Sequence, residues 1–437
     1  MQTLVKLLIV SLLTLSASFN SYALSSTPGQ SATLIYSGNL DGELEPCGCA
    51  EAGNFGGIMR RVTIVDELRQ ITPDLFLISA GGLIVNEAPQ DKNKSEYIFK
   101  GFATLNYDAI GLQHNDLTFG SDFTLQENLP WSVNNTSIAK VPTYRDIQKG
   151  GVTLRFFQWL SNNEHASMAG IHANTDQAAV TQLTQQLQQA KQQGKVTLLA
   201  STLTLDEAKK QLPLEWIDLL IIKANYEIYG EPQKAGNTLV LQPGSRGMRL
   251  GRLEFQVNNG SILSFKHAVI DMPNTIVDAP RMHDWYVAYN NAAAEFFKAK
   301  IAKQKNLKEE DKLFAGEAAC QNCHQQAHEI WSNTNHAEAY YKLMDVEKGY
   351  DPDCVGCHVL GLDKPGGFLD PMITENMMHV QCENCHGVAK NHVASKGKTK
   401  TGNNSWKPEQ MCAQCHVQKH SPEFKFDNYW PRIQHGK

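Results

Sequence analysis

The chain has 437 residues, more than one hydrophobic core usually contains, so its length predicts two or more domains. Its formal net charge of -5 is mild, and the charge distribution does not indicate a nucleic-acid partner. Eight of the ten cysteines fall in one repeated pattern near the C-terminus, which excludes a disulfide-rich scaffold.

Residues 1–23 have the features of a secretory signal peptide. Lys6 lies in a short n-region, an apolar run follows from Leu7 to Leu15, and small residues precede the predicted cleavage point after Ala23. The apolar run is too short to span a bilayer, and no other window of the sequence reaches that length. We therefore expect a mature chain without an integral membrane segment, either periplasmic or secreted to the cell surface.

Residues 32–271 alternate between short apolar runs and helical patterns. The strand candidates are 33–36, 75–78, 196–199, 219–222 and 238–241. Helices are expected over Gly57–Gln70 and Thr175–Gln193, and the turn Asn258–Gly260 between two alternating runs predicts a hairpin. This alternation predicts an α/β domain in which helices cover the faces of a layered sheet.

Four segments of this region resemble successive motifs of the 5'-nucleotidase-type metallophosphoesterases. They are Leu34–Gly42, Leu77–Gly82, Tyr107–Asp116 and Gln242–Arg252. The resemblance covers most of residues 32–271. It implies a four-layer α/β sandwich with a site where the C-terminal ends of strands meet loops.

The metal ligands of that family are largely missing. Its first-strand Asp-x-His falls on Asn39 and Asp41, its bridging Asp on Gly82, and its Gly-Asn-His-Asp/Glu motif on Gln113–Asp116. A later His-containing motif falls near Lys223–Tyr226, which has no histidine. A two-metal hydrolase needs several carboxylates and imidazoles to hold both ions, so we expect a metallophosphoesterase-like domain without phosphatase activity.

Cys47 and Cys49 follow the first predicted strand, and the resemblance would put them at the mouth of the ancestral site. Three interpretations stay open: a local disulfide or inert thiols, a soft-metal site, and a redox-active thiol pair. Arg60 and Arg61 lie in the helix that follows. They could bind an anion there, although arginines on a helix are more often plain surface.

Residues 272–313 are expected to be a helical linker. Apolar positions indicate an amphipathic helix that packs against one domain and ends in the charged segment Lys298–Lys312. These positions are Trp285, Val287, Ala288, Ala292, Phe296 and Ile301.

The pattern Cys-x-x-Cys-His occurs four times between residues 320 and 416, and each copy predicts covalent attachment of one haem c. The cysteine pairs are Cys320 and Cys323, Cys354 and Cys357, Cys382 and Cys385, and Cys412 and Cys415; the proximal iron ligands are His324, His358, His386 and His416. A zinc ribbon would leave the four adjacent histidines unexplained. A thioredoxin-like motif would occur once, in a strand-helix context.

Residues 314–437 are similar to the tetrahaem cytochromes c that accept electrons from hydroxylamine oxidoreductase. The segments that carry the similarity are Ala319–His324, Ile330–Ala337, Tyr350–Val359, Lys364–Phe368 and Val380–Gly387. The resemblance implies a mainly α-helical multihaem domain that transfers electrons.

Six further histidines could supply distal iron ligands. His336 and His392 match positions of distal ligands in the family, His420 follows the fourth motif closely, and His379 precedes the third. His328 could face His324 on a helix or lie on the surface, and His435 lies in a terminal tail. The resemblance suggests that the second haem, on His358, lacks a distal ligand from the protein, although six histidines are enough for four irons.

These patterns together predict an exported tetrahaem cytochrome c that transfers electrons between redox partner proteins. The alternative is a multihaem oxidoreductase acting on a small nitrogen or sulfur compound, either at an open haem or at Cys47 and Cys49. A third hypothesis makes the N-terminal domain only a docking or assembly module.

Overall fold

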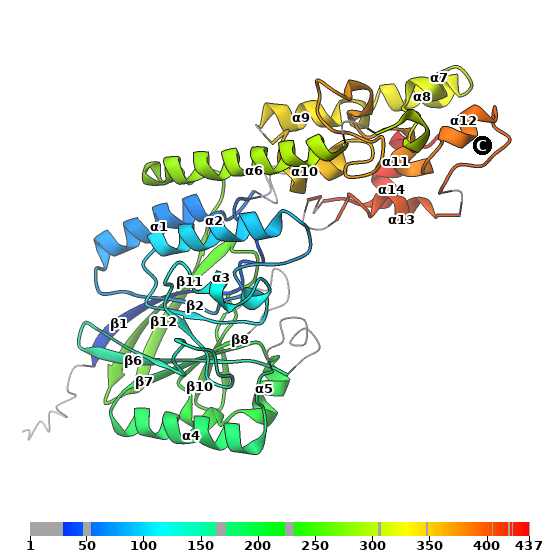
Figure 1. The fold of residues 1–437 in the computed structure, drawn as a ribbon. Helices are drawn as coiled ribbons and strands as arrows, with labels where there is room; N and C mark the ends of the chain where they lie inside the picture. The colour runs from blue at the N-terminus through cyan, green and yellow to red at the C-terminus, as the bar shows by residue number, and fades with distance from the viewer. Residues whose placement is uncertain are drawn as a thin grey trace, which may run out of the picture.

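The computed structural model describes residues 29–46, 54–162, 172–222, 231–304, 307–346, 348–403, 405–417, 420–421 and 423–436. The predicted signal segment, Cys47, Cys49 and the segment Lys223–Tyr226 lie outside the described residues. Figure 1 shows an N-terminal α/β domain and a C-terminal domain of short helices, joined by the long helix α6 (His283–Gln304). None of the described helices combines the length and the apolarity needed to cross a membrane.

Two six-stranded sheets form the centre of the N-terminal domain. The first has the order β12-β11-β1-β2-β3-β4, in which β1 to β4 are parallel and the β11–β12 hairpin pairs antiparallel with β1. Its strands are β1 (Gln30–Ser37), β2 (Phe76–Ser79), β3 (Ala109–Gly111), β4 (Trp131–Ser132), β11 (Arg249–Asn258) and β12 (Ser261–Asp271). The predicted hairpin is therefore confirmed.

The second sheet has the order β5-β6-β7-β8-β10-β9, with parallel strands in its centre and antiparallel strands at both edges. Its strands are β5 (Arg145–Lys149), β6 (Val152–Trp159), β7 (Val196–Ser201), β8 (Leu219–Ile222), β9 (Gln233–Ala235) and β10 (Thr238–Leu241). The central strands β7, β8 and β10 are buried along their whole length, as expected for strands covered on both faces.

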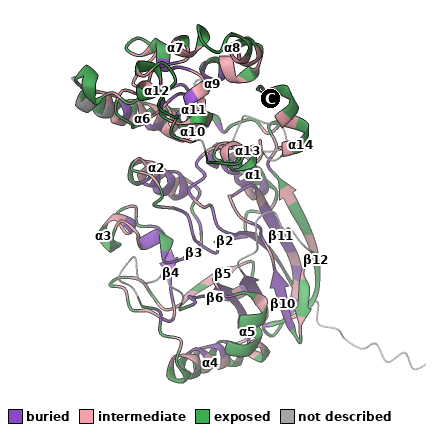
Figure 2. Ribbon diagram, turned by 90° about the vertical axis from the view of Figure 1, so that its right-hand side faces the viewer, coloured by how far each residue is buried: buried purple, intermediate pink, exposed green. Residues whose placement is uncertain are grey.

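Helices cover the outer faces of both sheets, which gives the four layers expected of this domain (Figure 1). One apolar core lies between the sheets, and Leu34 and Phe156 are fully buried in it. A second core lies under α1 (Ile58–Ile71) and α2 (Asp91–Thr104). A third lies under α4 (Gln177–Gln192) and α5 (Leu205–Gln211). Figure 2 shows this pattern as buried strands between partly exposed helices.

Local chemistry fixes where the helices of the second sheet begin. The Asp176 side chain accepts a hydrogen bond from the Ala179 N–H and caps α4. Thr204 and Glu207 form a capping box at the start of α5. The sequence prediction of a helix over Thr175–Gln193 is confirmed by α4.

The helix α6 belongs to both domains. The indole N–H of Trp285, near its start, donates to the Tyr97 carbonyl of α2 at 3.0 Å, and Tyr289 is buried in the core beneath α1 and α2. Phe297, near its end, is buried in the core of the C-terminal domain. A helix is thus present in the expected region, but the expectation that it packs against one domain is wrong, because its two ends are buried in the cores of different domains.

The C-terminal domain consists of short helices and turns. Its helices are α7 (Ala318–Gln321), α8 (Gln325–Ser332), α9 (Ala339–Asp345), α10 (Pro352–His358), α11 (Cys382–His386), α12 (Lys390–Ala394), α13 (Pro408–Cys412) and α14 (Phe426–Tyr429). Its apolar cluster includes Tyr340, Leu343, Val355, Val359 and Phe368, which surround the second Cys-x-x-Cys-His motif.

Candidate haem-binding site

Each Cys-x-x-Cys-His motif lies on a short helix or a tight turn. The second motif shows most clearly how the sequence forms it, because Pro352 starts α10 and the Asp351 side chain accepts a hydrogen bond from the Asp353 N–H at 3.0 Å. The helix then continues through Cys354 to His358. None of the eight motif cysteines forms a disulfide within the part of the chain that the structure describes.

The folded chain brings cysteines of different motifs into contact. A hydrogen bond to the Cys382 sulfur raises the pKa of Cys320, which places the first motif beside the third. A hydrogen bond to the Cys357 sulfur likewise raises the pKa of Cys415, which places the fourth motif beside the second. Burial, with a smaller contribution from Cys412, raises the pKa of Cys385 to about 11. The motifs therefore adjoin in the order first, third, fourth, second.

Three motif histidines face a second histidine at nearly the same distance. The ring centroids are 6.2 Å apart for His324 and His392, and 6.1 Å apart for His416 and His336. The same distance is 5.8 Å for His386 and His435. Two metal–nitrogen bonds of about 2 Å each, added to the half-widths of two imidazole rings, require a separation of this size. These three ring pairs fit a six-coordinate iron between the rings.

Hydrogen bonds fix the tautomer of several of these histidines. The Nδ1–H group of His392 donates to the Thr399 carbonyl at 2.6 Å, and that of His435 donates to the Ile433 carbonyl at 2.8 Å. The Nδ1–H group of His358 donates to the Ala339 carbonyl at 2.7 Å. A proton on Nδ1 leaves the Nε2 lone pair free, which is the state that a metal ligand requires.

The remaining candidates have other roles in the folded chain. The His328 ring donates from Nε2 to the Glu317 carboxylate at 2.5 Å, so this nitrogen is engaged. The Nδ1 of His379 accepts the Tyr340 backbone N–H at 3.2 Å, which puts the ring proton on Nε2 and argues against ligation by that nitrogen. His420 is not part of the three ring pairs and lines a different cavity, together with Cys354.

A cavity of about 390 Å³ is lined by residues of the first, third and fourth motifs. Its walls include five of the paired histidines, cysteines of three motifs and two tryptophans: His324, His336, His386, His392, His435, Cys320, Cys382, Cys385, Cys412, Trp331 and Trp430. Burial lowers the pKa of His336 and that of His386, with further lowering from neighbouring histidines, so both rings are held neutral. This donor set and space fit covalently attached haem.

Hydrogen-bonded amides fill the place at which the resemblance to metallophosphoesterases predicts a metal site. The Gln113 amide donates to Asn39 Oδ1 at 3.0 Å and to the Ala80 carbonyl at 2.8 Å. Asn39 in turn donates to Asp41 Oδ1 at 3.2 Å. Among the residues that the structure describes, no group of three or more potential ligands is arranged to hold a metal ion.

Gly82, where the family has its bridging aspartate, cannot accept a side chain without displacement. Its φ is +65°, and a Cβ there would lie 2.6 Å from the Asn39 side chain. The Asp116 carboxylate accepts hydrogen bonds from the backbone N–H groups of Gly82, Leu83 and Gln113 at 2.6–2.9 Å. It therefore holds the loops after β2 and β3 together. The two-metal centre of the family does not fit these residues.

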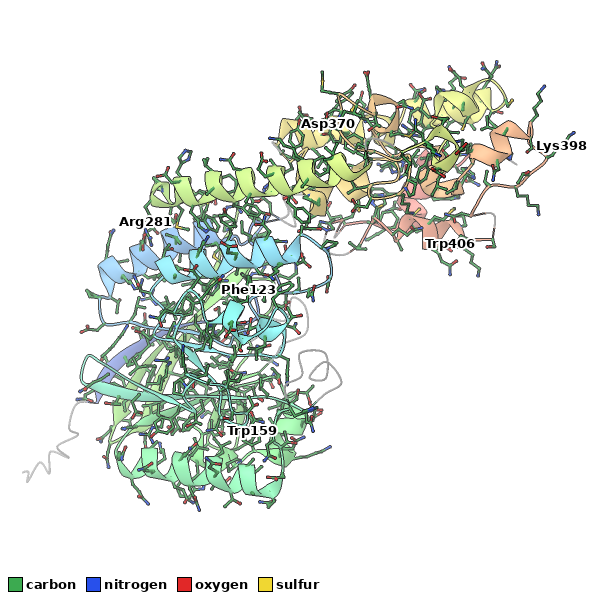
Figure 3. All side chains as sticks on the ribbon, viewed as in Figure 1. Phe123, Trp159, Arg281, Asp370, Lys398 and Trp406 are labelled. Atoms are coloured by element: carbon green, nitrogen blue, oxygen red, sulfur yellow. The ribbon has the colours of Figure 1, made fainter. Side chains whose placement is uncertain are left out.

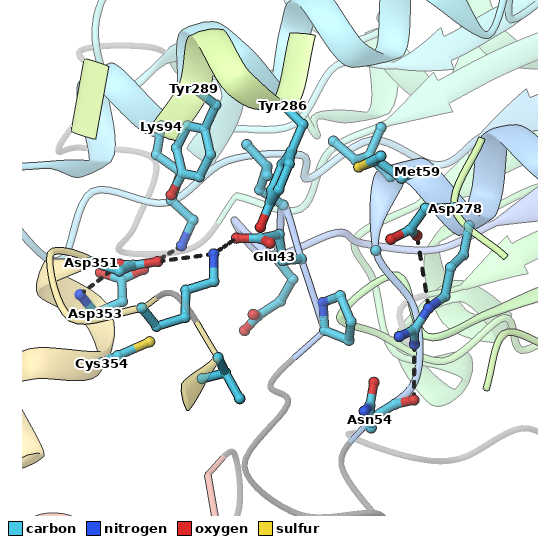
Figure 4. Close-up of a pocket in the computed structure, with 18 of the residues that line it drawn as sticks. Glu43, Asn54, Met59, Lys94, Asp278, Tyr286, Tyr289, Asp351, Asp353 and Cys354 are labelled. Carbon is cyan, nitrogen blue, oxygen red and sulfur yellow. Dashed lines mark hydrogen bonds and ion pairs between the residues drawn. The ribbon is translucent and has the colours of Figure 1, made fainter. Parts of the chain in front are cut away.

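A second cavity, of about 250 Å³, lies where the two domains meet (Figure 4). One wall of this cavity is formed by Glu43 of the N-terminal domain and by Tyr286 and Tyr289 of α6. The opposite wall is formed by Asp351 and Cys354 of the C-terminal domain. Ion pairs cross the boundary from Lys94 to Asp353 at 2.5 Å and from Lys348 to Glu45. The second Cys-x-x-Cys-His motif is therefore built against the N-terminal domain.

The two arginines of α1 differ in environment. Arg61 is 1% exposed and donates to the Tyr107 hydroxyl and to the Gly247 carbonyl, so it holds two loops together inside the fold. Arg60 lines the cavity between the domains, where burial lowers its pKa and Asp278 lies 4.0 Å away. The expectation of two plain surface arginines is wrong for Arg61.

The fold and the motif geometry define a chain of two parts: a sandwich domain of the phosphoesterase type, followed by a c-type cytochrome module. The family described as cytochrome c554 and c-prime matches residues 319–387. Cytochrome c-554 of Nitrosomonas europaea is 29% identical over 138 residues, which cover 24% of this chain and 59% of that protein. The chain thus spans 59% of the length of the curated relative it matches.

Solved structures resemble the N-terminal part. The sulfate thiohydrolase SoxB of Thermus thermophilus is similar with a TM-score of 0.51 at 14% identity, over 66% of this chain and 62% of that chain. The 5'-nucleotidase precursor of the same organism has a TM-score of 0.47 at 15% identity, over 72% of this chain and 68% of that chain. At 14% identity the similarity to SoxB shows the fold alone, which agrees with the four layers expected from the sequence.

One site residue that sequence reasoning set aside is His435. It lies in the terminal tail, where mobility is the usual expectation, yet its ring faces His386. No pattern in the residues around His435 indicates that it binds iron. The only signal in the sequence is that four motifs could need a second histidine each, which makes every additional histidine of the domain a candidate. His336 and His392, which sequence reasoning had singled out, are both brought opposite motif histidines.

Proposed function

We propose that this chain is an exported tetrahaem cytochrome c that transfers electrons between redox proteins. The observation that carries the proposal is the set of three facing histidine pairs with ring centroids 5.8–6.2 Å apart, each including a Cys-x-x-Cys-His histidine. Haem held by both histidines of such a pair would supply one-electron exchange, with no position left for a substrate to bind.

The chain's own residues prepare these sites for that role. Nδ1–H bonds to backbone carbonyls orient His392 and His435 and leave each Nε2 directed away from the bond. The thiol contacts between motifs put neighbouring sites side by side, in the order first, third, fourth, second. Such an arrangement supports conduction from one end of the domain to the other. We propose that export follows from residues 1–23 and delivers the protein to the periplasm or cell surface.

The number of haems is the direct test. Intact mass of the purified protein, together with haem staining on denaturing gels, should show four covalent haem additions. Replacing the cysteine pair of a single motif by serine, as in Cys412→Ser with Cys415→Ser, should remove one haem and leave three. A mature protein without covalent haem would refute the proposal.

A second candidate function is an oxidoreductase that acts on a small nitrogen or sulfur compound at the second haem. One observation favours it: His358 does not belong to any of the three facing histidine pairs, which contain the other three motif histidines. Its helix also lines the cavity between the domains. A high-spin haem that binds nitrite or sulfite would support this candidate, whereas four low-spin haems would exclude an open second haem.

A separate experiment tests whether an oxidoreductase reaction takes place at Cys47 and Cys49. Turnover that is lost in Cys47→Ser with Cys49→Ser, while all four haem signals persist, would place the reaction at the thiols. Unchanged electron transfer and turnover would favour an N-terminal domain that serves docking or assembly.

A further inference from the structure

Charge is distributed unevenly within the C-terminal domain. Residues 314–386 contain eleven acidic and three basic residues. The following segment, residues 387–408, contains five lysines and no acidic residue. We call this segment the lysine loop. It is a local positive region on a chain whose formal net charge is -5.

The central lysines of this loop face solvent. Lys396, Lys398 and Lys400 are exposed and make no ion pair with another residue of the described chain. Lys390, at the start of the loop, lies 3.6 Å from the Glu309 carboxylate. Figure 3 shows Lys398 at the end of the C-terminal domain that is farthest from the N-terminal domain, with its side chain pointing outward.

The backbone of the loop is fixed to two of the histidine pairs. The Asn403 N–H donates to the His386 carbonyl at 2.8 Å, and the Gly402 N–H donates to the Val388 carbonyl at 3.2 Å. The Thr399 carbonyl accepts the Nδ1–H of His392, whose ring faces His324. The positive surface is therefore held close to the first and third motifs.

We propose that the lysine loop is the docking surface for an acidic redox protein, which exchanges electrons with this chain at the first or third haem. The inference rests on the proposed electron-transfer function. Exposed lysines lose little hydration on approach and steer an oppositely charged partner, while the acidic remainder of the domain repels it. The partner is therefore turned toward the end of the molecule at which two haem sites lie.

A protein partner fits this surface better than a small anion does. The three central lysines are all exposed and lie at alternate positions of the loop, and none of them lines either of the two cavities described above. Exposed charges of this kind increase the rate at which two proteins meet and make that rate depend on salt. They raise the affinity of the complex less. This is the behaviour expected of a transient electron-transfer complex.

The test uses the holoprotein and flavodoxin hydroquinone, an acidic protein reductant, in stopped-flow experiments. One electron passes from the hydroquinone, which becomes the semiquinone, to a ferric haem, which becomes ferrous. The variant carries Lys396→Glu, Lys398→Glu and Lys400→Glu. We expect its second-order rate constant at low ionic strength to fall about tenfold, and the difference to disappear in about 1 M salt, where charges are screened beyond about 3 Å.

A matched control changes the same total charge elsewhere. Lys209→Glu, Lys210→Glu and Lys234→Glu reverse three exposed lysines of the N-terminal domain and should leave the rate constant within about twofold of the unmodified protein. Sedimentation of oxidised flavodoxin with the holoprotein at low salt gives a readout that requires no electron transfer. The loop variant should lose this association, and the control should keep it.

Reduced riboflavin, a small reductant that presents no protein surface, distinguishes electron transfer from docking. If riboflavin fails to reduce the unmodified protein, the proposed electron-transfer function is wrong. If the three substitutions slow reduction by riboflavin by the same factor as reduction by flavodoxin, the lysines act on the haems themselves and docking is refuted. Docking is also refuted if flavodoxin reduces all variants equally, or if the loop instead binds anionic phospholipid vesicles while flavodoxin rates stay unchanged.

Discussion

The Lys94 ammonium group lies 2.5 Å from the Asp353 carboxylate, so that an ion pair joins the N-terminal domain to the first turn of α10. Gln90 donates to the same carboxylate at 2.7 Å. Both residues come from the N-terminal end of α2, and Asp353 immediately precedes Cys354. The helix that carries the second haem motif is thus anchored in the phosphoesterase-type domain.

Removing Lys94 should loosen this anchor. In Lys94→Gln the partly buried Asp353 carboxylate loses its counter-charge, and we expect a loss of about 1–3 kcal/mol in the free energy of unfolding. Adding Asp353→Asn should restore part of this loss, because no uncompensated charge remains. Denaturant titration followed by haem absorbance measures both. Lys100→Gln, on the same helix but in an exposed pair with Glu96, should change stability by less than about 0.5 kcal/mol and serves as the control.

The histidine pairs predict which substitutions change haem spin state. His392→Ala and His435→Ala should each convert one of the four haems from low spin to high spin, because each removes one axial ligand. Electron paramagnetic resonance and carbon monoxide binding to the reduced protein detect the change. His379→Ala and His328→Ala should leave the spectrum unaltered, because hydrogen bonds engage these rings otherwise. A high-spin signal from His379→Ala would contradict our ligand assignment.

The N-terminal domain should not hydrolyse nucleotides. The Asn39 and Gln113 amides occupy the place of the bridging ligand, so added Mn²⁺ or Mg²⁺ should produce no phosphate release from a 5'-nucleotide. Gly82→Asp should not restore activity and should lower stability by about 1–3 kcal/mol, since the residue has φ +65° and would crowd Asn39. Metal-dependent hydrolysis by the unmodified protein would show that the site is intact.

Burial raises the pKa of Asp116 from an ordinary 3.8 to about 6, against the opposing effect of its backbone hydrogen bonds. The folded state therefore binds this proton more tightly than the unfolded state. The associated stability is fully present below about pH 3.8 and is lost as the pH rises through about 6. The loss is of the order of 3 kcal/mol.

Unfolding free energies of the unmodified protein and of Asp116→Asn, compared across this pH range, isolate the effect. Their difference should change with pH only between about 4 and 6, because the amide does not titrate. An unchanging difference would mean that Asp116 has an ordinary pKa in the folded chain.

Haem should be required for folding of the C-terminal domain. Its apolar cluster lies around the second motif, and the walls of the cavity between the other motifs are largely histidine and cysteine. With all eight motif cysteines replaced by serine, calorimetry of the full chain should show one transition, that of the N-terminal domain. A second, cooperative transition from the C-terminal domain would contradict this expectation.

Strand and helix positions in the N-terminal domain could be predicted because they depend on local periodicity. The five predicted strands and both predicted helices are present, since continuous apolar runs such as 219–222 are buried on both faces. The four Cys-x-x-Cys-His motifs could also be recognised from the sequence, because haem attachment requires two cysteines and a histidine within five consecutive residues. The packing of α6 against both domains could not be predicted. A helix that packs against two domains has a sequence pattern similar to that of a helix that packs against one.

The roles of the six additional histidines could not be separated by sequence. His435 and His379 differ through contacts with residues 49 and 39 positions away, and such contacts leave no trace in neighbouring residues. For the same reason the ion pair between Lys94 and Asp353 joins parts of the chain that no motif links.

The sequence by itself determined the α/β pattern of the N-terminal domain and the four Cys-x-x-Cys-His motifs that follow it, because each of these features depends on residue identity at short spacing. Only the tertiary structure decided which histidine faces which motif, that the ancestral metal site is closed by the Asn39 and Gln113 amides, and that the second motif is built against the N-terminal domain. Those relationships join residues far apart in the chain, and they exist only once packing has fixed the distances between them.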